Sequence, residues 1–247
     1  MKKTVQNRKV GCDLKIRSGI YWDQGGRRSN QDSLSLQQVR ISRGRALMAV
    51  VSDGIGGLAE GENASGYIVE KLIGHFYQQV IWLLGKGKGC KTLRKSIIRC
   101  FYETEEELTG YARERGIKLG ATVSLLLVWK RRYMIAHLGD SRIYLYSGQK
   151  RRLLTEDHSD GRGGLTKCLG SFPFQVPYIH CGRIRGKCGL LLCTDGFYRQ
   201  QSEESFALLK PGEIESEGQI ERRLWEMAQF ALKRGEKDNM SAIYVRL

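Results

Sequence analysis

A carboxylate at the end of an apolar stretch is the first feature of this sequence that could do chemistry. The stretch "AVVSDGIGG" ends in Asp53, and Gly54, Gly56 and Gly57 follow it. Glycine allows backbone conformations and close approaches that other residues do not. Oxygens from a carboxylate and a neighbouring carbonyl are the ligands that Mg²⁺ and Mn²⁺ prefer. This stretch alone fits either a metal ligand or an ordinary turn capped by Asp53.

The same arrangement, an aspartate beside Gly, Asn or Ser at a strand end, recurs four more times. The four are Asp32 in "NQDS", Asp140 in "GDSR", Asp195 in "TDGF" and Asp238 in "KDNM". One such aspartate is typical of a turn, whereas five predict that side chains from distant segments converge. Crowded carboxylates repel one another unless cations hold them together. The pattern therefore predicts a site for more than one metal ion.

Hydrophobic periodicity indicates the elements that would position these aspartates. Apolar residues at helical spacing predict helices over residues 62–84, 92–115 and 219–233. Two short strands are expected around a Gly-Arg turn within residues 21–39. Further strands are predicted at 46–54, 121–129, 133–140, 142–148, 151–155, 189–196 and 239–247.

The order of these elements indicates the fold class. Strands, two helices, a strand meander, a third helix and a last strand do not alternate as in a parallel sheet. The order favours antiparallel sheets covered by helices, an α+β architecture. No repeat and no long linker divides the sequence, so we expect a single domain over residues 1–247.

Composition places the chain among globular proteins. It has 247 residues, of which 41% are hydrophobic and 27% charged. No apolar run has the length of a membrane span, and the basic start lacks the apolar middle of a signal peptide, so we expect a cytoplasmic protein. The seven cysteines form no C-x-x-C pair, which indicates reduced thiols.

The net charge of +15 favours contact with polyanions. Aromatic residues are not interleaved with the basic patches as a base-stacking surface requires, so we do not predict nucleic-acid binding. A solvated basic face is the first expectation, and phosphate-bearing substrates are the second.

Eight short motifs in order give the sequence a family resemblance over nearly its whole length. They are "RRSNQD", "VVSDGIGGLAEGENAS", "GATVSLLL", "AHLGDSRIYLY", "LTEDHS", "LTKCLG", "LLLCTDG" and "KDNMS". In these segments the chain resembles the metal-dependent serine/threonine protein phosphatases of the PPM (PP2C) family, in their compact bacterial form. The resemblance implies a four-layer sandwich of two antiparallel sheets flanked by helix pairs, with metals at one end.

The resemblance also implies a set of metal ligands. Asp53 would bridge two tightly bound Mn²⁺ or Mg²⁺ ions, and Gly54 would offer its backbone carbonyl. Asp195 and Asp238 would complete the protein ligands of the first metal. Asp140 would bind a third, weaker ion.

Two further residues acquire roles from the same resemblance. Asp32 would hold metal-bound waters, and Arg27 would grip the substrate phosphate with its guanidinium fork. The implied reaction is hydrolysis of phosphoserine and phosphothreonine by a metal-bridging hydroxide, with no phosphoenzyme. The implied partners are phosphorylated proteins, substrates of a serine/threonine kinase, and we expect a monomer.

The sequence departs from the family pattern at three places. Gln31 stands where many relatives carry Glu beside the motif aspartate. No histidine follows Asp53-Gly54, so the proton donor to the leaving group stays unassigned, with a metal-bound water as our hypothesis. The flap of bacterial relatives is reduced to "DGRGG" at residues 160–164.

Several alternatives accompany this interpretation. A catalytically weak or inactive scaffold of the same fold is the non-enzyme alternative, although Asp53, Asp195 and Asp238 are all present. The segment "GKGKGCKT" at 85–92 nearly spells a phosphate-binding loop but follows a helical pattern rather than a strand. His137 lies out of phase with its apolar neighbours, which favours a polar sheet residue over one that faces the site.

Overall fold

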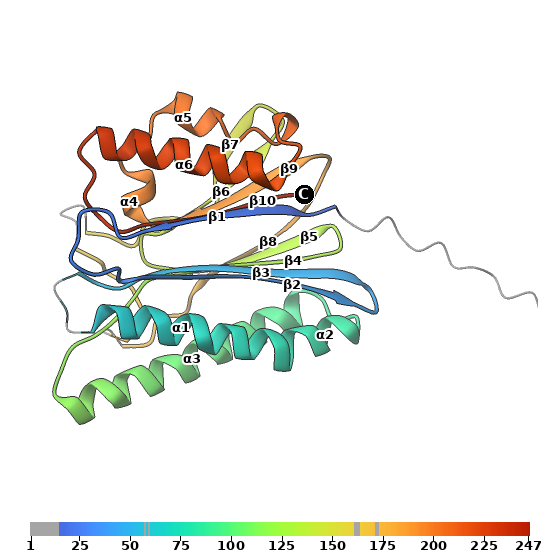
Figure 1. Ribbon diagram of the computed structural model, residues 1–247. Coiled ribbons are helices and arrows are strands. Elements are labelled where there is room, and N and C mark those ends of the chain that lie inside the picture. The colour runs from blue at the N-terminus through green and yellow to red at the C-terminus, as the bar shows by residue number, and fades with distance from the viewer. Residues whose placement is uncertain (1–14, 57, 59, 161–163, 171–172) are drawn as a thin grey trace, which may run out of the picture.

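Two five-stranded antiparallel sheets stack face to face, and helices cover both outer faces (Figure 1). The computed structural model describes residues 15–56, 58, 60–160, 164–170 and 173–247. Sheet A has the order β1 (Arg17–Asp23), β10 (Met240–Arg246), β9 (Cys188–Cys193), β6 (Arg142–Ser147) and β7 (Lys150–Leu153). Sheet B has the order β2 (Asp32–Ile41), β3 (Gly44–Asp53), β4 (Val123–Trp129), β5 (Arg132–Leu138) and β8 (Tyr178–Arg183).

Strand β3 shows why the layers form in this order. Side chains alternate between the two faces of a strand, so a strand covered on both sides is apolar throughout. Leu47, Ala49 and Val51 enter the core between the sheets, where Leu190, Leu192 and Ile243 of sheet A meet them. Met48 and Val50 point the other way, into the core beneath the helices. The continuous apolar run of β3 therefore builds two cores at once.

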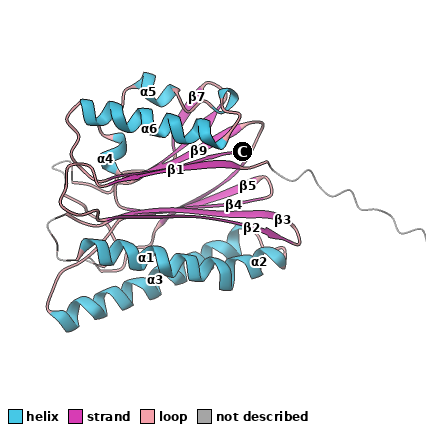
Figure 2. Cartoon of the chain, in the orientation of Figure 1, coloured by secondary structure: helices cyan, strands magenta, loops and turns pink. Residues whose placement is uncertain are grey.

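The helices are split between the two outer faces (Figure 2). The core beneath sheet B is closed by α1 (Gly61–His75) and α3 (Cys90–Arg115). The core above sheet A is closed mainly by α6 (Glu217–Lys233). The shorter elements are the π-helical turn η1 (Phe76–Val80), α2 (Ile81–Gly85), α4 (Asp195–Tyr198), α5 (Glu203–Ala207) and the 3₁₀ turn η2 (Pro211–Glu213).

The antiparallel sandwich flanked by helices is confirmed, and several details of the elements differ from expectation. The helix predicted over residues 62–84 is interrupted by η1 and continues as α2. The strand predicted to 196 ends at Cys193, because Asp195 already begins a helical turn. The edge strand β8 and the helix α5 carry too weak a periodicity to have been predicted. The segment at 85–92 joins α2 to α3, so no strand precedes it.

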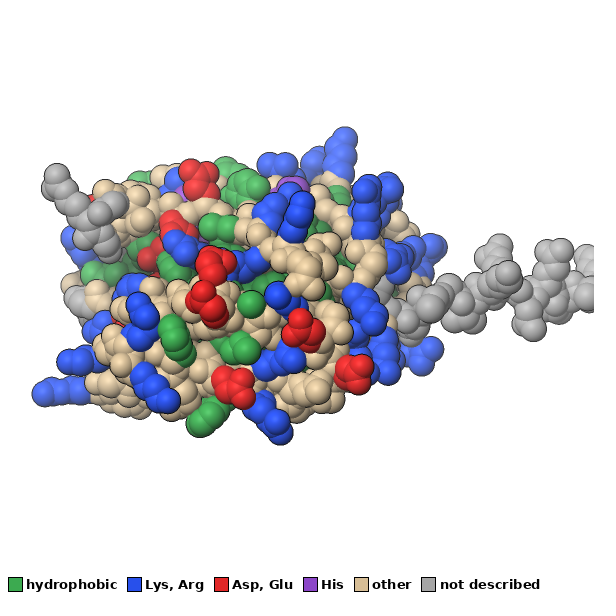
Figure 3. Space-filling view, turned by 90° about the horizontal axis from the view of Figure 1, so that it is seen from above, with side chains coloured by type: hydrophobic (Ala, Val, Ile, Leu, Met, Phe, Trp, Pro, Cys, Tyr) green, Lys and Arg blue, Asp and Glu red, His purple; other side chains and the backbone are tan. Residues whose placement is uncertain are grey.

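Basic side chains lie among acidic ones on the face of the molecule that carries α5 and α6. Figure 3, the face carrying α5 and α6, shows Lys and Arg side chains around much of the outline with Asp and Glu between them. This mixture agrees with the expected solvated basic surface. Among the residues that the structure describes, no helix is long and apolar enough to cross a membrane.

Candidate functional site

The site begins where β2 starts and β3 ends, at one edge of sheet B. Asp32 and Asp53 are directly opposite each other in the antiparallel register of these strands. Opposed residues in such a pair have Cβ atoms about 5 Å apart, and like charges there destabilise the pairing. The register therefore sets two mutually repelling carboxylates side by side.

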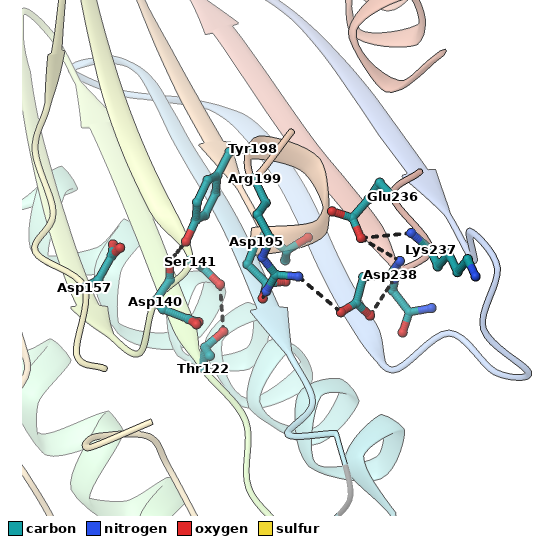
Figure 4. Close-up of polar contacts among 12 residues, drawn as sticks. Thr122, Asp140, Ser141, Asp157, Asp195, Tyr198, Arg199, Glu236, Lys237 and Asp238 are labelled. Carbon is teal, nitrogen blue, oxygen red and sulfur yellow. Dashed lines mark hydrogen bonds and ion pairs between the residues drawn. The ribbon is translucent and has the colours of Figure 1, made fainter. Parts of the chain in front are cut away.

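Sheet A supplies two more carboxylates at the same end of the sandwich. Asp195 follows β9 as the first residue of α4, and Asp238 lies two residues before β10, the antiparallel neighbour of β9. Gly196 allows the two segments to pack closely. A Cβ at this position would lie 2.2 Å from the carbonyl oxygen of Asn239 and 2.9 Å from Cβ of Asp238. The first turn of α4 and the loop of Asp238 are thus neighbours (Figure 4).

Asp32 links the two sheets. The hydroxyl of Thr194 donates a hydrogen bond to Asp32 Oδ2 at 2.9 Å, and the indole of Trp22 donates to the Asp32 carbonyl oxygen at 3.1 Å. The residue is only 2% exposed, and its Oδ1 accepts no hydrogen bond of normal geometry from the described residues. A buried carboxylate oxygen in this condition suits a cation or an ordered water.

Asp140 occupies the turn between β5 and β6, where the chain passes from sheet B to sheet A. The hydroxyl of Tyr198, on α4, donates to the Asp140 carbonyl oxygen at 3.1 Å, which ties this turn to the segment of Asp195 (Figure 4). Burial, aided by the charge of Asp195, raises the pKa of Asp140 to about 6. The fifth predicted aspartate therefore lies at the same end as the other four.

The loop after Asp53 passes close to the start of β2. The amide of Gly54 donates to the carbonyl oxygen of Gln31 at 3.0 Å, and a Cβ on Gly54 would lie 2.4 Å from the carbonyl oxygen of Gly61. Only glycine fits this approach. Gln31 Nε2 donates to Glu62 Oε2 at 3.2 Å. A glutamate in place of Gln31 would face Glu62 with like charge, so the amide suits its neighbour.

The electrostatics of the cluster show how strongly the carboxylates interact. Burial raises the pKa of Asp53 well above its ordinary value, and four neighbouring aspartates raise it further: Asp32, Asp195, Asp140 and Asp238. Burial raises the pKa of Asp32 to about 7, although the hydrogen bond from Thr194 opposes the shift. Negative charge is thus unfavourable here without cations.

Two arginines compensate part of this charge. Arg27 Nη2 donates to Asp238 Oδ2 at 2.8 Å, so the predicted phosphate-binding residue contacts a predicted metal ligand. Arg199 forms an ion pair with Asp195, and its Nη1 lies 3.9 Å from Asp238 Oδ2. Sequence reasoning missed Arg199. Arg199 follows Asp195 by four residues, and residues at this spacing share a helix face. This spacing was the sequence signal that could have predicted the ion pair.

His137 is a buried polar residue of the sheet, as favoured from its phase. It is fully buried, its Nδ1 lies 2.8 Å from Ser124 Oγ, and its Nε2 lies 3.1 Å from the Glu156 carbonyl oxygen. A carbonyl only accepts hydrogen bonds, so Nε2 carries a proton. Nδ1 therefore accepts the proton of the Ser124 hydroxyl, and the same Oγ lies 3.2 Å from the Ser141 carbonyl oxygen. His137 therefore supports the turn of Asp140 from inside the protein.

The shortened flap is described only at its ends. Residues 161–163, the middle of the predicted flap remnant at 160–164, lie outside the described residues. Ser159 and Leu165 form an antiparallel bridge, and the Asp160 amide donates to the Gly164 carbonyl oxygen at 2.8 Å. The two ends of the segment are therefore adjacent.

The donor set fits hard divalent cations. The converging side chains are carboxylates, and burial leaves Asp32 Oδ1 without a hydrogen bond of normal geometry. Within the part of the chain that the structure describes, no three His, Cys, Asp or Glu side chains form a ready-made ligand cluster. Asp195 and Asp238 pair with arginines instead. Metal binding at these residues would require both side chains to exchange arginine for metal.

The two stacked antiparallel sheets with aspartates gathered at one end can be compared with known protein families. The sequence model of the family described as "Protein phosphatase 2C" matches residues 25–242. The chain belongs to the protein phosphatase 2C family. Metal dependence is a property of that family.

The chain is also similar to individual proteins of the family. It is 33% identical over 118 residues to the serine/threonine phosphatase stp of Listeria welshimeri, which is 45% of this chain and 43% of that relative. The alignment thus spans less than half of the relative's length.

Solved structures agree with the fold. The serine/threonine phosphatase Stp1 of Staphylococcus aureus superposes with a TM-score of 0.81 at 22% identity, covering 98% of this chain and 99% of that one. The catalytic domain of the phosphatase PstP, solved in complex with two manganese ions, superposes with a TM-score of 0.71 at 22% identity, covering 93% of this chain and 97% of that one.

Proposed function

We propose that this protein is a metal-dependent phosphatase that hydrolyses phosphoserine and phosphothreonine in proteins. The observation that carries the proposal is the convergence of carboxylates from both sheets at one end of a protein phosphatase 2C sandwich. Asp32 and Asp53 come from sheet B, and Asp195 and Asp238 from the end of sheet A. Burial and the charges of the neighbouring aspartates raise the pKa of Asp53, and bound cations would relieve that unfavourable negative charge.

The proposed metal site uses the residues identified in the sequence. Asp53 would hold two ions together with the carbonyl of Gly54, and Asp195 and Asp238 would be further ligands of one of them. Asp140, at the rim of the cluster, holds a third and weaker ion. Bound Mn²⁺ or Mg²⁺ supplies Lewis acidity and lowers the pKa of water, so that hydroxide is available near neutral pH to attack phosphorus in line.

The remaining roles fall to side chains beside the carboxylates. Asp32, anchored by Thr194, orients water through its free Oδ1. Arg27 is 55% exposed and reaches into the cluster, so its guanidinium can turn from Asp238 to the oxygens of a substrate phosphate. That movement would remove the contact of Arg27 with Oδ2 of Asp238. The proposed partners are phosphoproteins produced by a serine/threonine kinase.

The test is hydrolysis of a phosphothreonine peptide by the purified chain with Mn²⁺, with Mg²⁺ and with excess chelator. We expect turnover with either ion and none in chelator. Asp53→Asn should lose several orders of magnitude in kcat, because this residue serves both ions. Circular dichroism in chelator should show the variant folded.

The controls separate the enzyme from its alternatives. Glu221→Gln, on the exposed face of α6, is a matched loss of one carboxylate away from the cluster and should leave turnover unchanged. Equal activity in excess chelator would refute the metal mechanism. Absence of hydrolysis with every divalent ion would favour the inactive scaffold.

A further inference from the structure

The side chain of Arg199 lies between two of the predicted metal ligands, Asp195 and Asp238. Arg199 extends from the end of α4 across the acidic cluster (Figure 4). It pairs with Asp195 on its own helical turn, and its Nη1 lies 3.9 Å from Oδ2 of Asp238. Two carboxylates from different segments thus share one guanidinium.

The electrostatic effect of Arg199 extends over several candidate ligands. Its charge lowers the pKa of Asp195 and of Asp140, opposing the rise that burial causes in both. The Asp195 side chain is 13% exposed and that of Asp238 is 23% exposed, so solvent screens these charges only in part. Arg199 therefore does for the metal-free protein part of what a divalent ion would do.

We propose that Arg199 is an internal counter-cation that competes with the divalent metal for Asp195 and Asp238. The inference rests on the proposed function, because it assumes that these aspartates bind metal. A guanidinium remains charged at every physiological pH and cannot leave the site by losing its proton. It must move aside, and its side chain, 50% exposed, has solvent to move into.

Competition of this kind raises the stability of the metal-free protein and lowers its affinity for metal. The metal-free protein gains stability, because Arg199 offsets repulsion between carboxylates. Metal affinity falls by the free energy of the contacts that must be broken. The chain would then need a higher metal concentration to become active than the same site without Arg199. Among the described residues Arg27 forms an ion pair with Asp238 and with no second carboxylate, so it does not span two segments in this way.

The experiment compares Arg199→Gln with wild type by calorimetric titration with Mn²⁺ and by thermal melts in chelator. We expect the variant to bind Mn²⁺ about fivefold more tightly, which corresponds to about 1 kcal/mol. That is the scale of one half-exposed ion pair with a weaker second contact. In chelator the variant should melt at a lower temperature than wild type. Arg28→Gln, an exposed arginine beside Arg27, is the matched control and should change neither quantity.

The outcomes distinguish this inference from the proposed function. If wild type and Arg199→Gln bind Mn²⁺ with equal affinity, or the variant binds more weakly, the competition is overturned while the metal site stands. If neither protein binds Mn²⁺, the proposed function fails and the competition fails with it. A variant that loses affinity for inorganic phosphate at unchanged Mn²⁺ affinity would identify Arg199 as a substrate residue instead.

Discussion

Replacing Asp32 by asparagine should stabilise the metal-free protein. The carboxylate is buried beside other carboxylates, and its pKa rises from 3.8 to about 7 on folding. A group whose folded pKa is raised binds its proton more tightly in the folded state, so its ionisation at neutral pH costs stability. The cost is absent below about pH 4 and grows until the pH reaches about 7.

The magnitude follows from the size of the shift. About three pKa units at about 1.4 kcal/mol each give a cost on the order of 4 kcal/mol at pH 7.5. The asparagine side-chain oxygen can still accept the hydrogen bond from the Thr194 hydroxyl. Its Nδ2 takes the place of Oδ1, which has no hydrogen-bond partner, so the amide donor is left without an acceptor. An unsatisfied buried amide costs about 1–3 kcal/mol. The expected net gain is about 2 kcal/mol, or roughly 4–8 °C in Tm for a chain of this size.

The assay is differential scanning calorimetry of wild type and Asp32→Asn in excess chelator at pH 7.5 and pH 5.0. The gain should be present at pH 7.5 and should largely disappear at pH 5.0, where the folded wild type already holds the proton. Asp23→Asn, on the exposed end of β1, is the matched control and should leave Tm unchanged at both pH values. A loss of stability at pH 7.5, or a gain independent of pH, would refute the reasoning.

Three further predictions concern the neighbouring residues. Arg27→Ala should raise KM for a phosphopeptide without weakening Mn²⁺ binding, whereas Arg28→Ala should leave both unchanged; an equal rise of KM in the two variants would indicate that positive charge in general, and not a placed guanidinium, binds the substrate. Asp140→Ala should remove the weakest Mn²⁺ binding event in calorimetry and slow turnover chiefly at low metal; unchanged stoichiometry and affinity would make Asp140 a turn residue only. Burial lowers the pKa of His137 to about 4 from 6.5, so its contribution to stability is complete above pH 6.5 and declines as the pH falls toward 4. Urea unfolding should show the stability difference between wild type and His137→Gln shrink by about 3 kcal/mol from pH 7.5 to 4.5; a constant difference would contradict the shift.

The sequence by itself determined the layers of the fold and the identity of the site's carboxylates. The apolar run of β3 and the helical spacing in α3 and α6 are local patterns, because burial on a face depends on the period of the chain alone. Asp53 and Asp195 could be recognised because each follows such a run and precedes glycine. The edge strand β8 has no regular apolar pattern, because its burial depends on the elements packed beside it. The sequence therefore did not predict it.

Only the tertiary structure decided which of these groups face one another. The opposition of Asp32 and Asp53 is a consequence of strand register, which no local pattern encodes. The pairing of Arg27 with Asp238 joins residues 211 positions apart, and the contact of Arg199 with Asp238 depends on the close packing that Gly196 allows. Attraction and repulsion between charges depend on distance in space, so the balance of cations in this site exists only once the two sheets are stacked.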